Sequence, residues 1–255
     1  LVADELREGV SLKSLGEHRL KDLQRPELIY QLVHPDMPAD FPAIASLNLL
    51  PNNLPLQTTV FVGREAELEK ITGLLLGDSV RLLTLLGPGG TGKTRLALQA
   101  AAEVAEHFRD GTFFIELAPI RDSQSVLTTI ARTIGLKESS DETLLEDMQA
   151  QLRDKQLLLV LDNFEQVTEA ALSVAELLMY APNLKLLVTS REPLRLLAEW
   201  QVNLDGLEFP QEGDANIGDF PAVRLFVQAA HQAYPLTNER RRLVHLHVAI
   251  GQLLD

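Results

Sequence analysis

The feature that most constrains this chain is an eight-residue segment, residues 87–94, that reads GPGGTGKT. It follows a mostly apolar run of strand length at 80–86 and precedes an Ala-, Leu- and Glu-rich stretch at 95–108 that is typical of a helix. Its four glycines allow the backbone to turn tightly and to bring N–H groups close to an anion: Gly87, Gly89, Gly90 and Gly92. Strand, glycine-rich turn and helix in this order predict a phosphate-binding loop.

The polar residues of this segment suit nucleotide chemistry. Lys93 supplies a cation for β- and γ-phosphates, and Thr94 offers a hydroxyl group to Mg²⁺. Thr91, inside the loop, and Arg95, at the start of the following helix, complete the nucleotide contacts that we expect. The helix directs the positive end of its dipole at the same anion. The alternative is an ordinary glycine-rich turn.

Composition narrows the class of protein. The chain has 255 residues, 45% of them hydrophobic, which is ordinary for a soluble globular protein. A net charge of −13 argues against nucleic-acid binding by this segment. Cysteine is absent and no apolar run reaches membrane-spanning length, so we expect a cytoplasmic protein without membrane contact. The chain begins with Leu1, not Met, which is typical of a fragment.

The pattern along the chain predicts four regions. Residues 1–34 contain two strand-like runs, 15–20 and 28–33, and are interpreted as the C-terminal remnant of a domain. Five prolines between 35 and 58 predict an extended linker. Residues 59–210 form the nucleotide domain, and 211–255 begin a helical subdomain that we expect to be incomplete, with helices from Pro221 to about 234 and from Asn238 onward.

Strand-like and helix-like segments alternate through the central region. We predict strands at 112–117, 157–161, 184–188 and 200–204, and helices at 123–135, 141–154 and 165–180. Such alternation predicts an α/β fold, with a mostly parallel sheet and helices on both faces.

An apolar strand at 157–161 ends in Asp162, which would lie beside the glycine loop and hold Mg²⁺ through its water shell. The alternative is that Asp162 only begins a turn. Many ATPases place a carboxylate directly after this aspartate to activate water, but here that residue is Asn163. Glu165 is the nearest substitute as a base, or else a residue of the first helical turn, and Asn163 with Gln166 resembles a capping box.

The next apolar strand ends in Thr189-Ser190-Arg191. Polar groups at that strand end would face the γ-phosphate side, where Arg191 could sense or stabilise phosphate charge. A solvated loop arginine is the alternative. Residues 61–65, FVGRE, open the domain, and Gly63 permits a tight turn there.

Together these motifs resemble the STAND class of P-loop ATPases, specifically the NB-ARC-like modules of bacterial multidomain regulators. The resemblance covers residues 58–255 and depends on FVGRE at 61–65, GPGGTGKT at 87–94, LLLVLDNFEQV at 157–167, LLVTSREPLRL at 186–196 and the stretch 200–207. It implies a P-loop NTPase fold, binding of ATP and ADP with Mg²⁺, and a nucleotide-controlled switch acting on effector and sensor domains of the same chain, with self-oligomerisation on ATP binding. It also implies that Phe61, Val62, Gly63 and Arg64 contact adenine, Asp162 serves Mg²⁺ and Arg191 is the sensor.

Residues 1–34 resemble the C-terminal tail of class III adenylate/guanylate cyclase domains, through LGEHRLKDL at 15–23 and YQL at 30–32. The metal-binding residues of such a domain would lie upstream, so cyclase activity is not expected from this chain. Three functions stay open: a regulatory switch with slow hydrolysis, a fast AAA+-type remodelling ATPase, and a scaffold that binds nucleotide for structural support.

Overall fold

The computed structural model describes residues 10–18, 27–34, 50–57, 59–136, 143–214 and 216–233. The chain divides into two compact units. The first consists of Leu1–Val60 and Glu65–Asp205, and the second of Phe61–Arg64 with Gly206–Asp255. The helix predicted from Asn238 onward lies outside the described residues.

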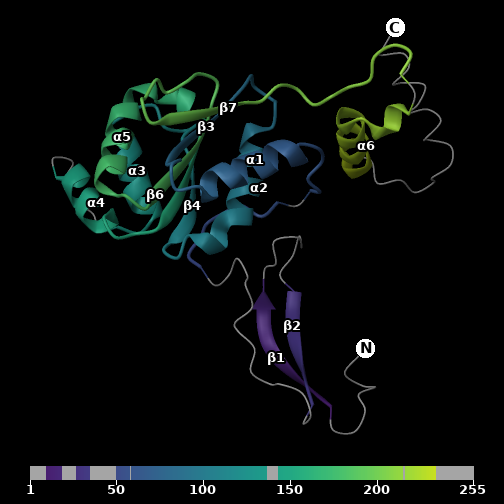
Figure 1. Cartoon of the computed structure of the whole chain (residues 1–255), viewed down its shortest axis with the longest axis horizontal. Coiled ribbons are helices and arrows are strands. Elements are labelled where there is room, and N and C mark those ends of the chain that lie inside the picture. The colour runs from purple at the N-terminus through teal and green to yellow at the C-terminus, as the bar shows by residue number, and fades with distance from the viewer. Residues whose placement is uncertain are drawn as a thin grey trace. The chain divides into compact units, whose positions relative to one another are not determined.

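Strands and helices alternate along the first unit (Figure 1). Its strands are β1 Ser11–His18, β2 Glu27–Val33, β3 Leu82–Leu86, β4 Gly111–Glu116, β5 Leu157–Asp162, β6 Leu184–Ser190 and β7 Glu199–Asn203. Its α-helices are α1 Glu65–Leu76, α2 Lys93–Val104, α3 Ser125–Thr133, α4 Leu144–Leu152 and α5 Ala171–Tyr180. Short 3₁₀ turns are η2 Ala105–His107, η3 Phe164–Gln166 and η4 Thr168–Ala170.

Five strands form the central sheet, in the order β4-β5-β6-β3-β7, and every neighbouring pair is parallel. The strands β3, β5 and β6 are apolar almost throughout because helices cover both faces of the sheet. Leu157, Leu159 and Leu161 belong to the core cluster beneath α3, α4 and α5. Leu158 and Val160 alternate with them and are equally buried, as the pleat requires.

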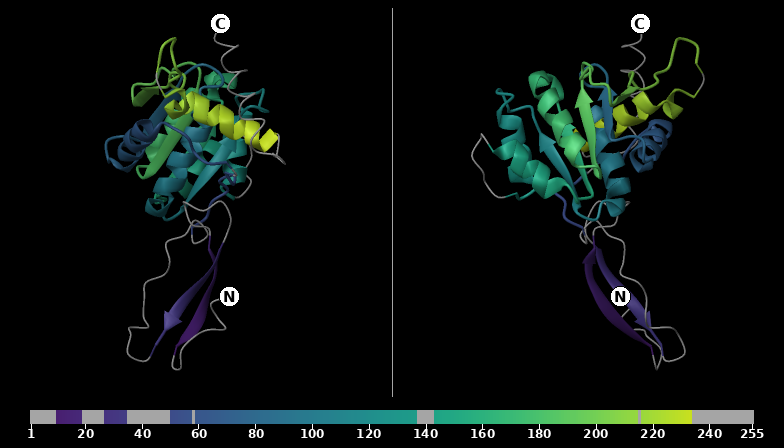
Figure 2. Two further views of the ribbon diagram at one scale, coloured as in Figure 1. Left: turned by 90° about the vertical axis from the view of Figure 1, so that its right-hand side faces the viewer. Right: turned by 60° about the vertical axis from the view of Figure 1, so that its left-hand side comes forward.

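The α-helices of the first unit lie in two layers (Figures 1 and 2). One layer holds α2 against β3, β5 and β6, with α1 packed on α2, and the other holds α3, α4 and α5. Apolar side chains at helical spacing explain the packing of α1, which buries Leu68, Ile71 and Leu75. The predicted α/β fold, with a parallel sheet covered on both faces, is confirmed.

Some boundaries differ from the predictions. The predicted helix at 165–180 begins as two 3₁₀ turns, and α5 starts only at Ala171, because Val167 adopts φ −138° and ψ 40° and interrupts the helix. The helix α2 starts at Lys93, two residues earlier than predicted, and ends at Val104. Helix α1 was not predicted.

The C-terminal part of the predicted linker packs on the sheet edge. Asn52 forms a parallel bridge with Thr112, and Asn53 exchanges two hydrogen bonds with the backbone of Phe114, at 2.6 and 2.8 Å. Leu54 is buried. The packed unit therefore begins before residue 59, where the sequence prediction placed its start, and this segment covers the edge of β4.

The strands β1 and β2 form a separate antiparallel pair, from Ser11 opposite Val33 to His18 opposite Glu27. The second strand agrees with the predicted run at 28–33, and the first begins at Ser11, four residues before the predicted start.

The second unit contains η5 Ile217–Asp219 and α6 Pro221–Ala233, a helix that the sequence predicts from its opening proline. A Cβ atom on Gly63, whose φ is +69°, would lie 2.9 Å from the Cβ of Pro221. Glycine is therefore required where the segment Phe61–Arg64 meets the start of α6. In the part of the chain that the structure describes, no helix is long and apolar enough to cross a membrane.

Candidate functional site

The glycine loop connects β3 to α2 at the carboxyl edge of the sheet. Gly92 takes the N-cap position of α2 in the left-handed conformation, with φ 86° and ψ 18°. A side chain on Gly87 would meet the carbonyl oxygen of Leu204, which follows β7. Thr91 donates a hydrogen bond from Oγ1 to the Pro88 carbonyl oxygen, at 3.0 Å. The loop is thus a tight turn that only glycine-rich sequence can form at these points.

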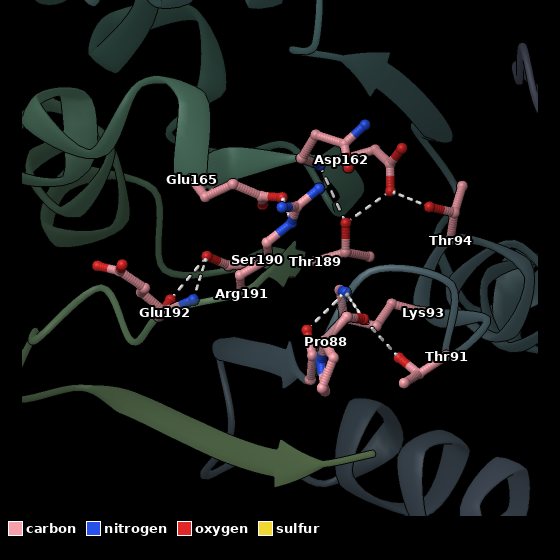
Figure 3. A network of polar contacts seen from close by, with 12 residues as sticks. Pro88, Thr91, Lys93, Thr94, Asp162, Glu165, Thr189, Ser190, Arg191 and Glu192 are labelled. Atoms are coloured by element: carbon pink, nitrogen blue, oxygen red, sulfur yellow. Dashed lines mark hydrogen bonds and ion pairs between the residues drawn. The ribbon is translucent and has the colours of Figure 1, made fainter. Parts of the chain in front are cut away.

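Lys93, the first residue of α2, folds back over the loop. Its Nζ donates hydrogen bonds to the carbonyl oxygens of Gly87 and Pro88, at 2.7 and 2.9 Å (Figure 3). The side chain is buried, and this burial lowers the pKa of Lys93. The negative charges of Glu165 and Asp162 raise the pKa and partly offset that effect, while the nearby Arg191 adds to the lowering.

The first turn of α2 carries charges of the wrong sign for a helix N-terminus. Lys93 and Arg95 both lie in it, whereas the first turns of α1 and α4 carry acidic residues. A cation at the positive end of a helix dipole destabilises the helix by a few tenths of a kcal/mol to about 1 kcal/mol. A bound anion at the same helix end would remove this cost. The loop, the helix end and Lys93 together offer the N–H groups and the positive charge that a polyanion such as a phosphate chain requires.

Asp162 lies at the end of β5 and is held by two hydroxyl groups. Thr94 Oγ1 donates to Asp162 Oδ1 at 2.7 Å, and Thr189 Oγ1, from the end of β6, donates to the same oxygen at 2.6 Å (Figure 3). Asp162 and Thr189 are buried. The structure therefore brings together Thr94 and Asp162, the two residues predicted to serve Mg²⁺.

These residues fit a magnesium ion that is bound mainly through water and phosphate. Mg²⁺ prefers oxygen ligands, and one hydroxyl and one carboxylate are what the protein contributes where a nucleotide supplies the rest. Among the described residues no cluster of three or more His, Cys, Asp or Glu side chains could hold a metal alone.

Asn163 does not act as a helix cap. It adopts the left-handed conformation, with φ 60° and ψ 47°, and no side-chain capping bond is present at this described residue. The N–H of Gln166 instead bonds the backbone oxygen of Asn163, at 3.2 Å, which closes a 3₁₀ turn. The predicted capping box is therefore wrong, because the left-handed turn at Asn163 replaces the extended backbone that such a cap needs.

The turn after Asp162 places Glu165 next to Arg191, the residue that follows β6. Glu165 Oε1 lies 3.1 Å from Arg191 Nε. The Glu165 side chain is only 11% exposed, whereas that of Arg191 is 63% exposed. Arg191 also lies over the loop, since its Nη2 is 3.5 Å from the position of a Cβ on Gly89. Both members of the pair thus lie at the carboxyl edge of the sheet, beside the glycine loop.

Arg95 contacts the segment that precedes residue 61, and not this cluster. Arg95 donates hydrogen bonds to Gln57 Oε1 and to the Thr59 carbonyl oxygen, and burial lowers its pKa. It therefore fastens α2 to the segment before residue 61. Phe61, Val62, Gly63 and Arg64 belong to the second unit, and their expected contact with adenine stays a prediction.

Sequence reasoning named Thr189 only as part of a polar strand end and gave it no role of its own. The signal was present as a hydroxyl residue at the end of an apolar strand, where parallel strands bring polar ends together. Its hydrogen bond to Asp162, and another at 3.0 Å from the Asn163 N–H to Thr189 Oγ1, became visible only once β5 and β6 were known to be neighbours.

Comparison with known proteins agrees with this geometry. Residues 78–198 match the model of a family described as AAA domain. The match contains the glycine loop, Asp162 and Arg191, and it agrees with the predicted P-loop NTPase fold. It does not reach residues 1–34, so their resemblance to cyclase tails stays a prediction, as does the assignment to the NB-ARC subgroup.

Several of the matching relatives are named as regulators. A protein of Mycobacterium bovis named as a putative HTH-type transcriptional regulator is 38% identical over 156 residues, which are 61% of this chain and 16% of the relative. The regulatory protein AfsR of Streptomyces griseus is 32% identical over 165 residues, 60% of this chain and 16% of that protein. The chain thus spans about one sixth of the length of these relatives.

Among solved structures, one that resembles this chain is a Signal Transduction ATPase with Numerous Domains (STAND) from Pyrococcus horikoshii, which carries a tetratricopeptide repeat sensor. It is 20% identical, with a TM-score of 0.42, and the superposition covers 58% of this chain and 24% of that one.

Proposed function

We propose that this chain is an ATP- and ADP-binding switch module, with slow hydrolysis, that controls a linked effector in a multidomain regulator. The observation that carries the proposal is the meeting of Lys93, Thr94 and Asp162 at the mouth of a glycine loop, with Thr94 Oγ1 2.7 Å from Asp162 Oδ1. Phosphate recognition needs a cation and free N–H groups at that place, and magnesium needs the hydroxyl and carboxylate beside them.

Each residue has a role in this proposal. Lys93 exchanges its carbonyl partners for β- and γ-phosphate oxygens, and the N–H groups of the segment Gly89 to Thr94 surround the same phosphates. Thr94 and Asp162 would hold Mg²⁺, which when bound neutralises charge on the phosphate oxygens. Thr189 orients Asp162, and Arg191 meets the terminal phosphate.

Slow hydrolysis is supported by the residues after Asp162. Asn163 carries an amide, which cannot accept a proton as a carboxylate does. Glu165, the alternative base, is engaged with Arg191. A switch requires only that ATP and ADP stabilise different conformations, and a slow step that converts one nucleotide into the other suits that role.

Regulation is supported by the names of the relatives, a transcriptional regulator and a regulatory protein, and by their much greater length. The effector of this chain, which we expect to be a cyclase or a transcriptional regulator, would lie in the same parent chain. Self-oligomerisation on ATP binding belongs to the same proposal.

Calorimetric titration tests the proposal. ADP and ATP are titrated, with and without Mg²⁺, into the wild-type chain and into Asp162→Asn. We expect the wild type to bind both nucleotides with Kd values on the order of micromolar, and Mg²⁺ to strengthen ATP binding only in the wild type. Asp154→Asn, at an exposed carboxylate in the turn after α4, is the matched control and should behave as the wild type.

The outcomes separate the three functions. Absence of binding by folded wild-type chain would overturn the proposal. Turnover above roughly one per second would favour a remodelling ATPase. Identical hydrogen-exchange protection with ATP and ADP would favour a structural ligand.

A further inference from the structure

Glu165 carries an oxygen that its ion pair with Arg191 does not use. Oε1 faces Arg191 Nε at 3.1 Å. The other oxygen, Oε2, is buried, and no described residue gives it a hydrogen bond. The ion pair therefore joins an exposed arginine to a carboxylate that is largely buried. Burying a carboxylate costs free energy of desolvation, which only a nearby cation or hydrogen-bond donor can offset.

The ion pair uses one part of the guanidinium group and leaves another over the glycine loop. The carboxylate takes Nε, while Nη2 is the Arg191 atom nearest to Gly89. Figure 3 shows the Arg191 guanidinium beside Glu165, with Asp162 at the neighbouring strand end and the Lys93 side chain beside the glycine loop. The terminal nitrogens are thus available on the side from which a phosphate chain would approach.

The backbone before Glu165 explains its position. Asn163 turns left-handed directly after Asp162, and η3 follows, so Glu165 lies in a 3₁₀ turn. From there its carboxylate reaches Arg191, the residue after β6. Phe164, the residue between Asn163 and Glu165, is fully buried and anchors the turn in the core. The carboxylate is therefore held by the fold, and Arg191, which is the more exposed partner, is the group that gains order from the pair.

Charge balance gives a second reason for the carboxylate. Arg191 and Lys93 are both cations at one loop, and each disfavours the charge of the other. Burial is the main cause that lowers the pKa of Lys93; Glu165 raises this pKa and Arg191 lowers it further, so the carboxylate counteracts the mutual repulsion.

We propose that Glu165 is a positioning residue, which holds Arg191 by its Nε so that the terminal nitrogens of the guanidinium meet the third phosphate of ATP. The inference rests on the proposed nucleotide function and deepens it. Glu165 then sets how well the module distinguishes ATP from ADP, because only ATP has the phosphate that Arg191 reaches. It takes no proton from water, and Arg191, not Glu165, contacts the nucleotide.

A double-mutant cycle tests this role. The Kd values of ATPγS and ADP, both with Mg²⁺, are measured for the wild type, Glu165→Gln, Arg191→Ala and the double variant. We expect Glu165→Gln to reduce the preference for ATPγS over ADP by about fivefold, a modest figure because Arg191 is largely exposed. In the Arg191→Ala background, Glu165→Gln should change the preference no further.

Other roles for Glu165 give different results, each of which would overturn the proposal. A general base would leave both affinities unchanged in Glu165→Gln and lower only the turnover. A carboxylate that competes with phosphate for Arg191 would make ATPγS bind more tightly once it is removed. A purely structural residue would weaken ATPγS and ADP equally.

Two further variants keep the test decisive. Glu192→Gln removes the same charge from the exposed residue next to Arg191 and should leave the preference unchanged. If Glu165→Gln does not fold, Arg191→Lys provides the test. It replaces the exposed partner and keeps its charge but lacks Nε, and it should lose the preference for ATPγS about as much as Arg191→Ala.

If the wild type binds no nucleotide, the proposed function fails as well. If it binds and the variants match it, only the role of Glu165 fails.

Discussion

Two lysines at opposite edges of the sheet have similar partners and different surroundings. Lys93, at the carboxyl edge, donates to the carbonyl oxygens of Gly87 and Pro88. Lys185, at the start of β6, donates to those of Leu75 and Gly77, at 2.7 and 2.6 Å. In both cases desolvation is the main cause that lowers the pKa.

The difference lies in whether the surroundings suit a cation. The acceptors of Lys185 lie at the C-terminal end of α1, the negative end of the helix dipole, and Asp78 raises its pKa. Lys93 lies at the positive end of α2 and near Arg191. A cation in a matching field stabilises the fold, whereas a cation in an opposing field indicates that an anion belongs there.

The strongest test of this difference between Lys93 and Lys185 is to remove the charge of Lys93. We expect Lys93→Ala to weaken ATP and ADP binding by roughly a hundredfold, because the variant lacks the buried cation that we propose to pair with the phosphates. The unfolding midpoint should fall little. The burial cost of the Lys93 charge disappears, and the lost attraction to Glu165 and Asp162 is partly offset by the lost repulsion from Arg191. Calorimetry and thermal unfolding of the same samples measure both quantities.

Replacing Lys185 should have the opposite pattern. Lys185→Met keeps the aliphatic stem but leaves the carbonyl oxygens of Leu75 and Gly77 without that donor, at a cost of about 2 kcal/mol in the free energy of unfolding. Nucleotide affinity should stay within about twofold of the wild type. Urea unfolding gives the stability, and Lys70→Met, an exposed lysine on α1, is the matched control. A large loss of affinity with unchanged stability would contradict the assignment of Lys185 to the fold.

The sequence was sufficient to predict the features that depend on local pattern. The glycine loop, the buried strand ending at Asp162 and the parallel sheet follow from residue spacing and apolar periodicity. The roles of Thr189 and Lys185 were not predicted, because their partners depend on which strands and helices become neighbours. The turn at Asn163 was missed for another reason: its left-handed conformation leaves no mark in the sequence beyond asparagine itself.

Asp110 provides a smaller test of whether charges at the amino edge of the sheet are structural. It precedes β4 and accepts hydrogen bonds from the Gln156 N–H and Lys155 Nζ, both at 2.9 Å. The Gln156 N–H is the main cause that lowers the pKa of Asp110 below 3.8, followed by Lys155. These bonds join the starts of β4 and β5.

Asp110→Asn should therefore cost about 1 kcal/mol at pH 7, and less as the solution becomes acidic. The folded pKa lies below the unfolded value, so the stabilisation by the carboxylate is complete above pH 3.8 and is lost as pH falls through the folded pKa. Urea unfolding of both proteins between pH 7 and the lowest pH at which the wild type stays folded should show the two curves converging. A gap that stays constant with pH would mean that the shape of the side chain matters there, and not its charge. Nucleotide affinity at pH 7 should be unchanged, because the site lies at the other edge of the sheet.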